Sequence, residues 1–348
     1  MDNFLSILCF LMPSIVYYSA RNNPLATNYR LRKDFKLNGA KVEIPNGVVR
    51  KVDDIDEERF LKQEFGDLIL EFVDTIKRNV PSSDLALFYN NFNDVKTKVK
   101  DFKKLNFLCN GNVVARWVPK SKTIELSGSN SFLTINHELF HASSTYKDFD
   151  RDMYFSGFHQ YKSNKNQIGL GLNEGYTQYL AEKYFSHLPI FKAYPFEKSV
   201  ADVIELIVGE RMQSLYFNAN LDGLVEVLEQ YNSRENIYRF IRSLDVLCSH
   251  MNDRKLTHNS NLIRIDCAKG VNLFLIETYV RKIILESSFL GIDENKIYHK
   301  LGPLLTRIPN KIRIEGEDVS IFDACVLRDN LMDVFSEYKF GDDGKIRL

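Results

Sequence analysis

The sequence predicts an α+β protein in which a small strand-containing region precedes a mainly helical region. Helical periodicity is the first observation: apolar residues recur every three or four positions at 200–215, 221–231, 236–248, 271–285 and 318–338. The second is a pair of β-rich segments, 112–117 and 123–126, joined by the turn 119–122 as in a hairpin. We therefore expect an apolar N-terminal segment with an irregular lead-in at 1–50, a region of strands and helices at 51–190 and a helical region at 191–348.

The elements around the hairpin follow from the same spacing and from turn residues. We expect, in order, helices at 54–81, 82–102, 132–144 and 173–185, with a loop or second hairpin at 146–172. Ser129, Asn130 and Ser131 offer N-cap side chains to the third of these helices.

Charge balance and cysteine content narrow the class of protein. Lys and Arg together number 46, as do Asp and Glu, so the net charge is zero. This argues against a dedicated nucleic-acid binder, which normally carries a basic excess. The five cysteines are widely spaced and form no CxxC pair, which indicates reduced thiols in a cytosolic protein.

The apolar segment 4–20 is the stretch that could contact a membrane. Pro13 interrupts it. A secretory signal is disfavoured because no positive charge precedes the segment and no clean small-x-small cleavage site follows it. Arg21 and further basic residues follow, which under the positive-inside rule would leave the bulk of the chain in the cytoplasm. We expect a cytoplasmic protein with a buried or peripheral N-terminal segment; a membrane anchor or an atypical export signal is the alternative.

The segment His137-Glu138-Leu139-Phe140-His141 contains two candidate metal ligands and a candidate general base. Its HExxH spacing places both imidazoles on one face of a helix, where their nitrogens can converge on a zinc ion. Glu138 lies one position round the helix, where it can act as a general base without being a ligand. A zinc site needs a third protein ligand, and Glu174, at the start of the next expected helix, offers one. His159 or an acidic residue between 148 and 152 is the alternative.

The region from His137 to Leu180, with its HExxH helix followed by Asn173-Glu174-Gly175, resembles the gluzincin group of zinc metallopeptidases, the thermolysin-like and aminopeptidase N-like enzymes. The resemblance implies a zincin-like fold and one Zn²⁺ per chain, held by His137, His141 and Glu174, with Glu138 activating water for hydrolysis of a peptide or protein substrate. It also implies a donor for the transition state, for which Tyr154, His159, Tyr161 and Tyr176 are the candidates.

The chain departs from the group at two places. The Gly-x-Met-Glu-Asn segment by which the aminopeptidases bind a free amino terminus is absent, and Gln178 stands where the thermolysin-like pattern has an aspartate that orients a zinc histidine. We expect the strand 123–126 to form a sheet edge that pairs with extended peptides, and therefore cleavage inside polypeptides. A non-catalytic binding or regulatory protein on the same scaffold is the alternative function, and a helical interaction module with a chance motif is a third.

Overall fold

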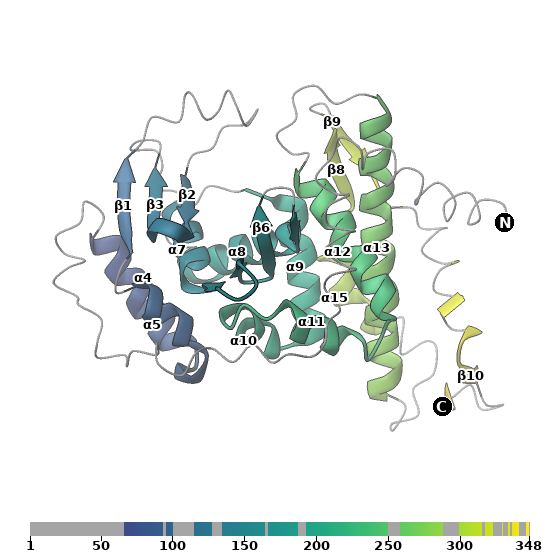
Figure 1. Cartoon of the computed structure of the whole chain (residues 1–348). Helices are drawn as coiled ribbons and strands as arrows, with labels where there is room; N and C mark the ends of the chain where they lie inside the picture. The colour runs from purple at the N-terminus through teal and green to yellow at the C-terminus, as the bar shows by residue number, and fades with distance from the viewer. Residues whose placement is uncertain are drawn as a thin grey trace.

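The computed structural model describes residues 66–92, 95–99, 115–126, 134–163, 166–186, 193–249, 258–287, 299–314 and 317–322, with short pieces between 329 and 347. The expectations for the N-terminal apolar segment and for the N-cap residues 129–131 lie outside the described residues. The mixture of helices and small sheets belongs to the α+β class, as predicted. A three-stranded sheet with α4 and α5 lies at one end of the described chain and α13 at the other, with α7 and α8 between them (Figure 1).

The first described elements are α4 (Gly66–Asn79), the short 3₁₀ helix η2 (Ser82–Asp84), α5 (Ala86–Phe92) and β1 (Lys96–Val99). The prediction of one helix over 82–102 is therefore wrong at 96–99; residues 93–94 and 100–102 lie outside the described residues. Val95, Thr97 and Val99 alternate with lysines at 96 and 98, which is the two-residue period of a strand rather than a helical repeat.

The predicted hairpin is present as β2 (Ala115–Val118) and β3 (Thr123–Leu126), joined by the 3₁₀ helix η3 (Pro119–Ser121). The strand order is β1-β3-β2, with β3 parallel to β1 and antiparallel to β2. The expectation that 123–126 forms the sheet edge is therefore wrong. Among the described strands β3 is central and β2 is the edge on the side of the HExxH helix, because β1, missed as a strand, covers the other side of β3.

The HExxH helix is α7 (Ile135–Ser143), buried along its whole length. It is followed by a four-stranded antiparallel sheet, where a loop or hairpin was expected. Its strands, in sheet order, are β4 (Thr145–Asp148), β5 (Met153–Ser156), β6 (His159–Ser163) and β7 (Asn166–Ile168).

The next helix, α8 (Leu170–Phe185), begins three residues earlier than predicted. The remaining helices are α9 (Pro195–Val208), α10 (Arg211–Phe217), α11 (Leu221–Leu228), α12 (Arg234–Ser249), α13 (His258–Ser287) and α15 (Gly302–Leu305). The apolar segment 200–215 is shared by α9 and α10, because Gly209 ends α9 with a φ of 73°. None of the described helices is both long and apolar enough to cross a bilayer.

The chain ends with the strands β8 (Lys311–Ile314), β9 (Glu317–Ser320), β10 (Lys339–Phe340) and β11 (Ile346–Arg347). The prediction of a helix over 318–338 is wrong at its start, where β9 pairs antiparallel with β8. In β8 exposed and buried residues alternate, and Ile312 lies opposite Val319. At this point Val319 belongs to a strand pair whose buried residues alternate with exposed ones, and not to a helix.

Aromatic packing joins the first helices to the two helices of the candidate site. The Phe72 ring on α4 lies 5.5 Å from the rings of Phe92 on α5 and Phe185 on α8, and 4.9 Å from Phe140 on α7, which it meets edge-on. All four side chains are fully buried. This cluster fixes α7 and α8 against α4 and α5, and so holds the two helices in one position relative to each other.

Candidate metal centre

Helix α7 directs both histidines of the HExxH sequence to one side. Ile135, Leu139 and Ala142 are fully buried and lie on the opposite face of the helix. His137 and His141 are one turn apart, and their Nε2 atoms lie 3.0 Å from each other. The i, i+4 spacing therefore brings the two imidazoles together, as the sequence predicts.

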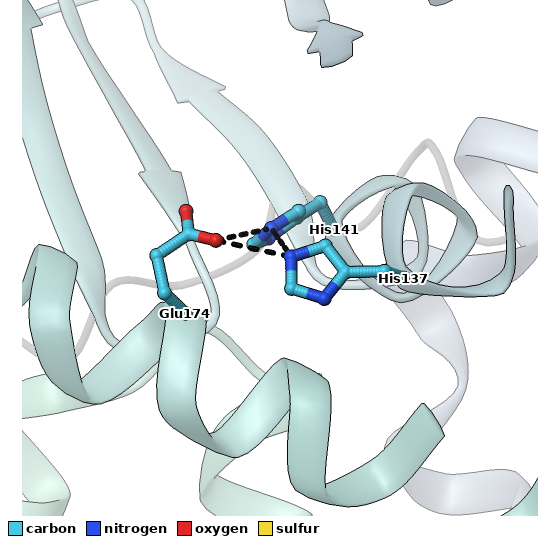
Figure 2. Close-up of side chains that lie close together, drawn as sticks. All are labelled: His137, His141 and Glu174. Carbon is cyan, nitrogen blue, oxygen red and sulfur yellow. Dashed lines mark hydrogen bonds and ion pairs between the residues drawn. The ribbon is translucent and has the colours of Figure 1, made fainter. Parts of the chain in front are cut away.

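Helix α8 supplies the third side chain. Glu174 lies in its first turns, and its Oε2 atom is 3.0 Å from Nε2 of His137 and 3.4 Å from Nε2 of His141. Figure 2 shows the carboxylate rising from α8 toward the two imidazoles, which come from the neighbouring helix. His137, His141 and Glu174 are the one group among the described residues whose ligand atoms lie close enough together to hold a metal ion.

These distances fit a zinc ion. Ligand atoms about 2.0 to 2.1 Å from zinc in a tetrahedral arrangement lie about 3.3 Å from one another. The three ligand atoms here are 3.0, 3.0 and 3.4 Å apart. Two imidazoles and one carboxylate are also a donor set found in zinc sites with an open fourth position.

The partner of His137 favours a metal on Nε2. Nδ1 of His137 lies 3.2 Å from Oε1 of Gln178, and the Gln178 amide nitrogen donates to Glu182. The amide oxygen therefore faces the imidazole and accepts its Nδ1–H, which leaves the Nε2 lone pair for a metal. Gln178 thus accepts from His137, the contact for which the thermolysin-like pattern has an aspartate.

The partner of His141 presents a donor to the imidazole, whereas the partner of His137 presents an acceptor. Asn173 accepts the backbone N–H of Phe158 with Oδ1, so its Nδ2 donates to Nδ1 of His141, 3.2 Å away. The His141 proton then lies on Nε2, facing Glu174. A metal on this nitrogen requires the proton to move to Nδ1, where it would need an acceptor.

The charges within this cluster act on one another. Burial raises the pKa of Glu174, but the facing His141 and His137 outweigh it and hold the pKa below its usual range. Burial lowers the pKa of His141, but the charge of Glu174, its hydrogen bond and the charge of Glu138 together outweigh it, so that pKa is raised. An ionised carboxylate is thus favoured, which is the state that binds a metal.

Glu138 stands apart from the three ligand atoms. Its Oε2 accepts the backbone N–H of Trp117 on β2 at 2.6 Å, and its side chain is buried. Burial raises the pKa of Glu138, opposed by His141 and His137. The structure thus leaves Glu138 outside the ligand set, held by the edge strand of the three-stranded sheet.

The four candidate donors differ in position. Tyr176 is fully buried and its hydroxyl donates to Glu205 at 2.6 Å, so it belongs to the contact between α8 and α9. Tyr154 and Tyr161 stack on each other across β5 and β6, and Tyr161 also stacks on His159.

His159, the alternative third ligand, lies beside the cluster without joining it. Its Nε2 lies 3.1 Å from Gln167 Oε1. Burial lowers its pKa to about 4, against the charge of Glu174. The acidic residues between 148 and 152 are likewise outside the metal-binding group.

Tyr194 is a residue of the site that the sequence reasoning missed. Its ring stacks on the imidazole of His137, 5.8 Å between centroids. The charge of Glu174 is the largest cause of its raised pKa. Its φ of 51° is unusual for a bulky residue, and such backbone conformations gather at functional sites. The pair Tyr194-Pro195 marks only the start of α9, since a residue before proline rarely continues a helix, and gave no sign of the contact with His137.

Comparisons with protein-family models, with curated proteins and with solved structures found no match.

Proposed function

We propose that the protein is a zinc-dependent peptidase of gluzincin type, with a zincin-like fold around the HExxH helix. One observation carries the proposal: three ligand atoms from two helices converge, and a fourth side chain, the acidic Glu138, lies beside them and is held separately by the Trp117 N–H. A cluster of ion pairs that served only stability would not require a separate carboxylate held beside the three ligand atoms.

The residues around the cluster have distinct roles in hydrolysis. Zinc, when bound, supplies a Lewis acid that polarises the scissile carbonyl and makes water more acidic. Glu138 takes the proton of the attacking water and passes it to the leaving amine. The Trp117 N–H fixes one carboxylate oxygen of Glu138, so that the other can accept this proton. Tyr194, whose ring stacks on the His137 imidazole, is our candidate donor to the developing oxyanion, and His159 is the alternative.

The edge strand β2 is the place for the substrate backbone. Trp117 N–H points away from β3, because it donates to Glu138. In an antiparallel pair the residues two apart point their backbone groups to the same side, so the N–H and C=O of Ala115 face the same way. An extended peptide can pair with these groups. Such pairing requires no free amino terminus, which favours cleavage within polypeptides.

Metal analysis and a matched pair of glutamate variants test the proposal. The purified protein should hold about one zinc per chain, and His137→Ala, His141→Ala and Glu174→Ala should each lose it, since each removes one of three ligands. Glu138→Gln should keep zinc and lose at least about a hundredfold in the hydrolysis of denatured protein and amino-blocked peptides.

Three results would contradict parts of the proposal. Stoichiometric zinc in His137→Ala/His141→Ala would exclude the metal assignment. Zinc retained together with no hydrolysis in the wild-type protein would favour the non-catalytic alternative. Activity confined to peptides with free amino termini would exclude the role given to β2.

A further inference from the structure

Helix α8, which carries Glu174, has its N-terminus held by a side chain from a distant part of the chain. The Asp245 carboxylate on α12 accepts the backbone N–H of Gly169 at 2.9 Å with one oxygen and that of Gly171 at 2.9 Å with the other. The N–H of Leu170 also hydrogen-bonds to this carboxylate. Asp245 is only 2% exposed, so no water competes freely for these donors.

No residue at the start of α8 itself caps the helix, so the cap is Asp245. The N-cap position is Gly169, which has no side chain and a φ of 81°, so the helix has no local side-chain cap. A Cβ on Gly171 would lie 2.5 Å from the carbonyl oxygen of Leu244, so a glycine is required where α12 approaches. Gly171 thus admits α12 to the first turn of α8, and Asp245 accepts the N–H groups there.

The capped turn leads directly into the site. The first backbone bond of α8 runs from Asn173 N–H to the carbonyl of Gly169 at 2.9 Å. Asn173 contacts His141, and the next residue is Glu174. Movement of this turn therefore displaces the third ligand and a histidine partner together.

We propose that Asp245 is a positioning residue of the metal site, which fixes the first turn of α8 and so places Glu174 against the two histidines. The inference rests on the proposed function, because it assumes that the three residues bind a metal. A helix start that loses its cap frays, since its first N–H groups have no other partner. A frayed turn leaves Glu174 mobile while His137 and His141 on α7 stay in place.

Metal titration of three variants tests this. Asp245→Asn keeps one acceptor oxygen and nearly the same volume, and Asp245→Ala removes both acceptors. Asn220→Ala is the matched control, because Asn220 caps α11 by accepting the Gly223 N–H at 2.8 Å and α11 carries no ligand of the site. Zinc affinity is measured by competition with a chelator at pH 8, above the pKa of about 7 to which burial raises the Asp245 carboxyl. Each protein is kept well below its melting temperature, so that unfolding contributes nothing.

We expect zinc affinity to fall about tenfold in Asp245→Asn and more in Asp245→Ala, as for residues that orient metal ligands. The absorption spectrum of the Co²⁺-loaded protein should change in both, because the carboxylate ligand is displaced. Asn220→Ala should lower the melting temperature but leave affinity within about twofold, since α11 carries no ligand and Asn220 does not cap α8.

The outcomes separate this inference from the proposed function. Folded Asp245→Asn and Asp245→Ala with wild-type affinity and an unchanged Co²⁺ spectrum would overturn the role of Asp245 while leaving the metal site intact. If Asp245→Ala does not fold, Asp245→Asn alone decides by the same criteria. Equal losses of affinity in Asp245→Asn and Asn220→Ala would show a general effect of stability, against the inference. A wild-type protein that binds no zinc would overturn both.

Discussion

The two helices that build the candidate site are held in place in different ways. Helix α7 carries two of the ligand atoms on one short segment, and the spacing of His137 and His141 alone puts them together. Helix α8 carries the third, Glu174, and its position depends on contacts with distant segments: Asp245 at its start and α9 along its side. The histidine side of the site is thus encoded locally, and the glutamate side is encoded by the packing of the helical region.

This difference gives the metal site a particular vulnerability. Changes that alter the packing of α8 against α9 and α12 should disturb the site without touching any ligand. Changes of similar size elsewhere in the helical region should not.

The largest expected effect is that of Gly175→Ala. A Cβ at this position would lie 2.2 Å from the carbonyl oxygen of Glu197 on α9, a backbone atom that can move only with its helix. We expect a loss of about 3 kcal/mol in the free energy of unfolding, measured by chemical denaturation, because the two helices must separate. Zinc content should fall as well, since Gly175 follows Glu174.

A matched glycine variant sharpens this comparison. Gly270 lies within α13, where a Cβ would meet nothing within 4 Å. Gly270→Ala should stabilise the protein by up to about 1 kcal/mol, the gain in helix propensity, and leave zinc content unchanged. If Gly175→Ala were as harmless as Gly270→Ala, the close contact of α8 with α9 would not position the site.

The same difference explains how much of the site could be predicted from the sequence. The convergence of His137 and His141 follows from helix periodicity, and Asn173-Glu174-Gly175 pointed to the third member. Asp245 and Tyr194 were not predicted, because they are joined to the site by the packing of α9 and α12, which no local pattern encodes. Gln178 was identified as a departure from a family pattern, yet its amide oxygen faces His137.

Prediction of the fold succeeded and failed for related reasons. The hairpin of β2 and β3 and most helices of the C-terminal region have strong local signals and were found. Strand β1 was missed, although its residues alternate, because the segment is only four residues long and its pairing partner lies far along the chain in β3. That one omission also produced the error about the sheet edge, since the position of a strand within a sheet depends on all its neighbours.

Two buried glutamates lie on different sides of the site, and one of them should make stability depend on pH, an effect of intermediate size. Glu138 on the α7 side has a backbone N–H as a partner, whereas Oε2 of Glu197 on the α9 side has no hydrogen-bond partner. Burial, together with the charge of Glu174 and against that of Arg264, raises the pKa of Glu197 from 4.5 to about 7. The folded protein therefore binds this proton more tightly than the unfolded chain. The resulting stabilisation is complete below pH 4.5 and is lost as the pH rises through 7.

Replacing this carboxyl should remove part of that pH dependence. Glu197→Met has a similar volume and no ionisable group. The wild type should lose about 2 kcal/mol more of its free energy of unfolding than this variant when the pH rises from 5 to 8. Denaturation of the metal-free protein at both pH values measures this. Glu235→Gln, at an exposed position on α12, is the control and should show no such change. A Glu197→Met variant with the wild-type pH dependence would exclude this account of Glu197.

The smallest expected effect is on zinc affinity, and it depends on the different partners of the two histidines. His137 already faces an amide oxygen, but His141 faces the amide nitrogen of Asn173, whose oxygen is engaged by the Phe158 N–H. Asn173→Asp has the same shape and presents an oxygen to both groups. It can accept the Nδ1–H that His141 must carry when Nε2 binds a metal, so zinc affinity should rise about tenfold.

The converse change on the other histidine completes the comparison. Gln178→Glu removes the amide that donates to Glu182 and places two carboxylates 3.0 Å apart, so the orientation of His137 is lost and affinity should fall. Because Asn173 is only 1% exposed, Asn173→Asp should also destabilise the metal-free protein, since its new charge is buried. Chelator competition and thermal melting with and without zinc measure both effects. Equal affinity in the two variants would show that the opposite orientations of Asn173 and Gln178 have no consequence for the metal.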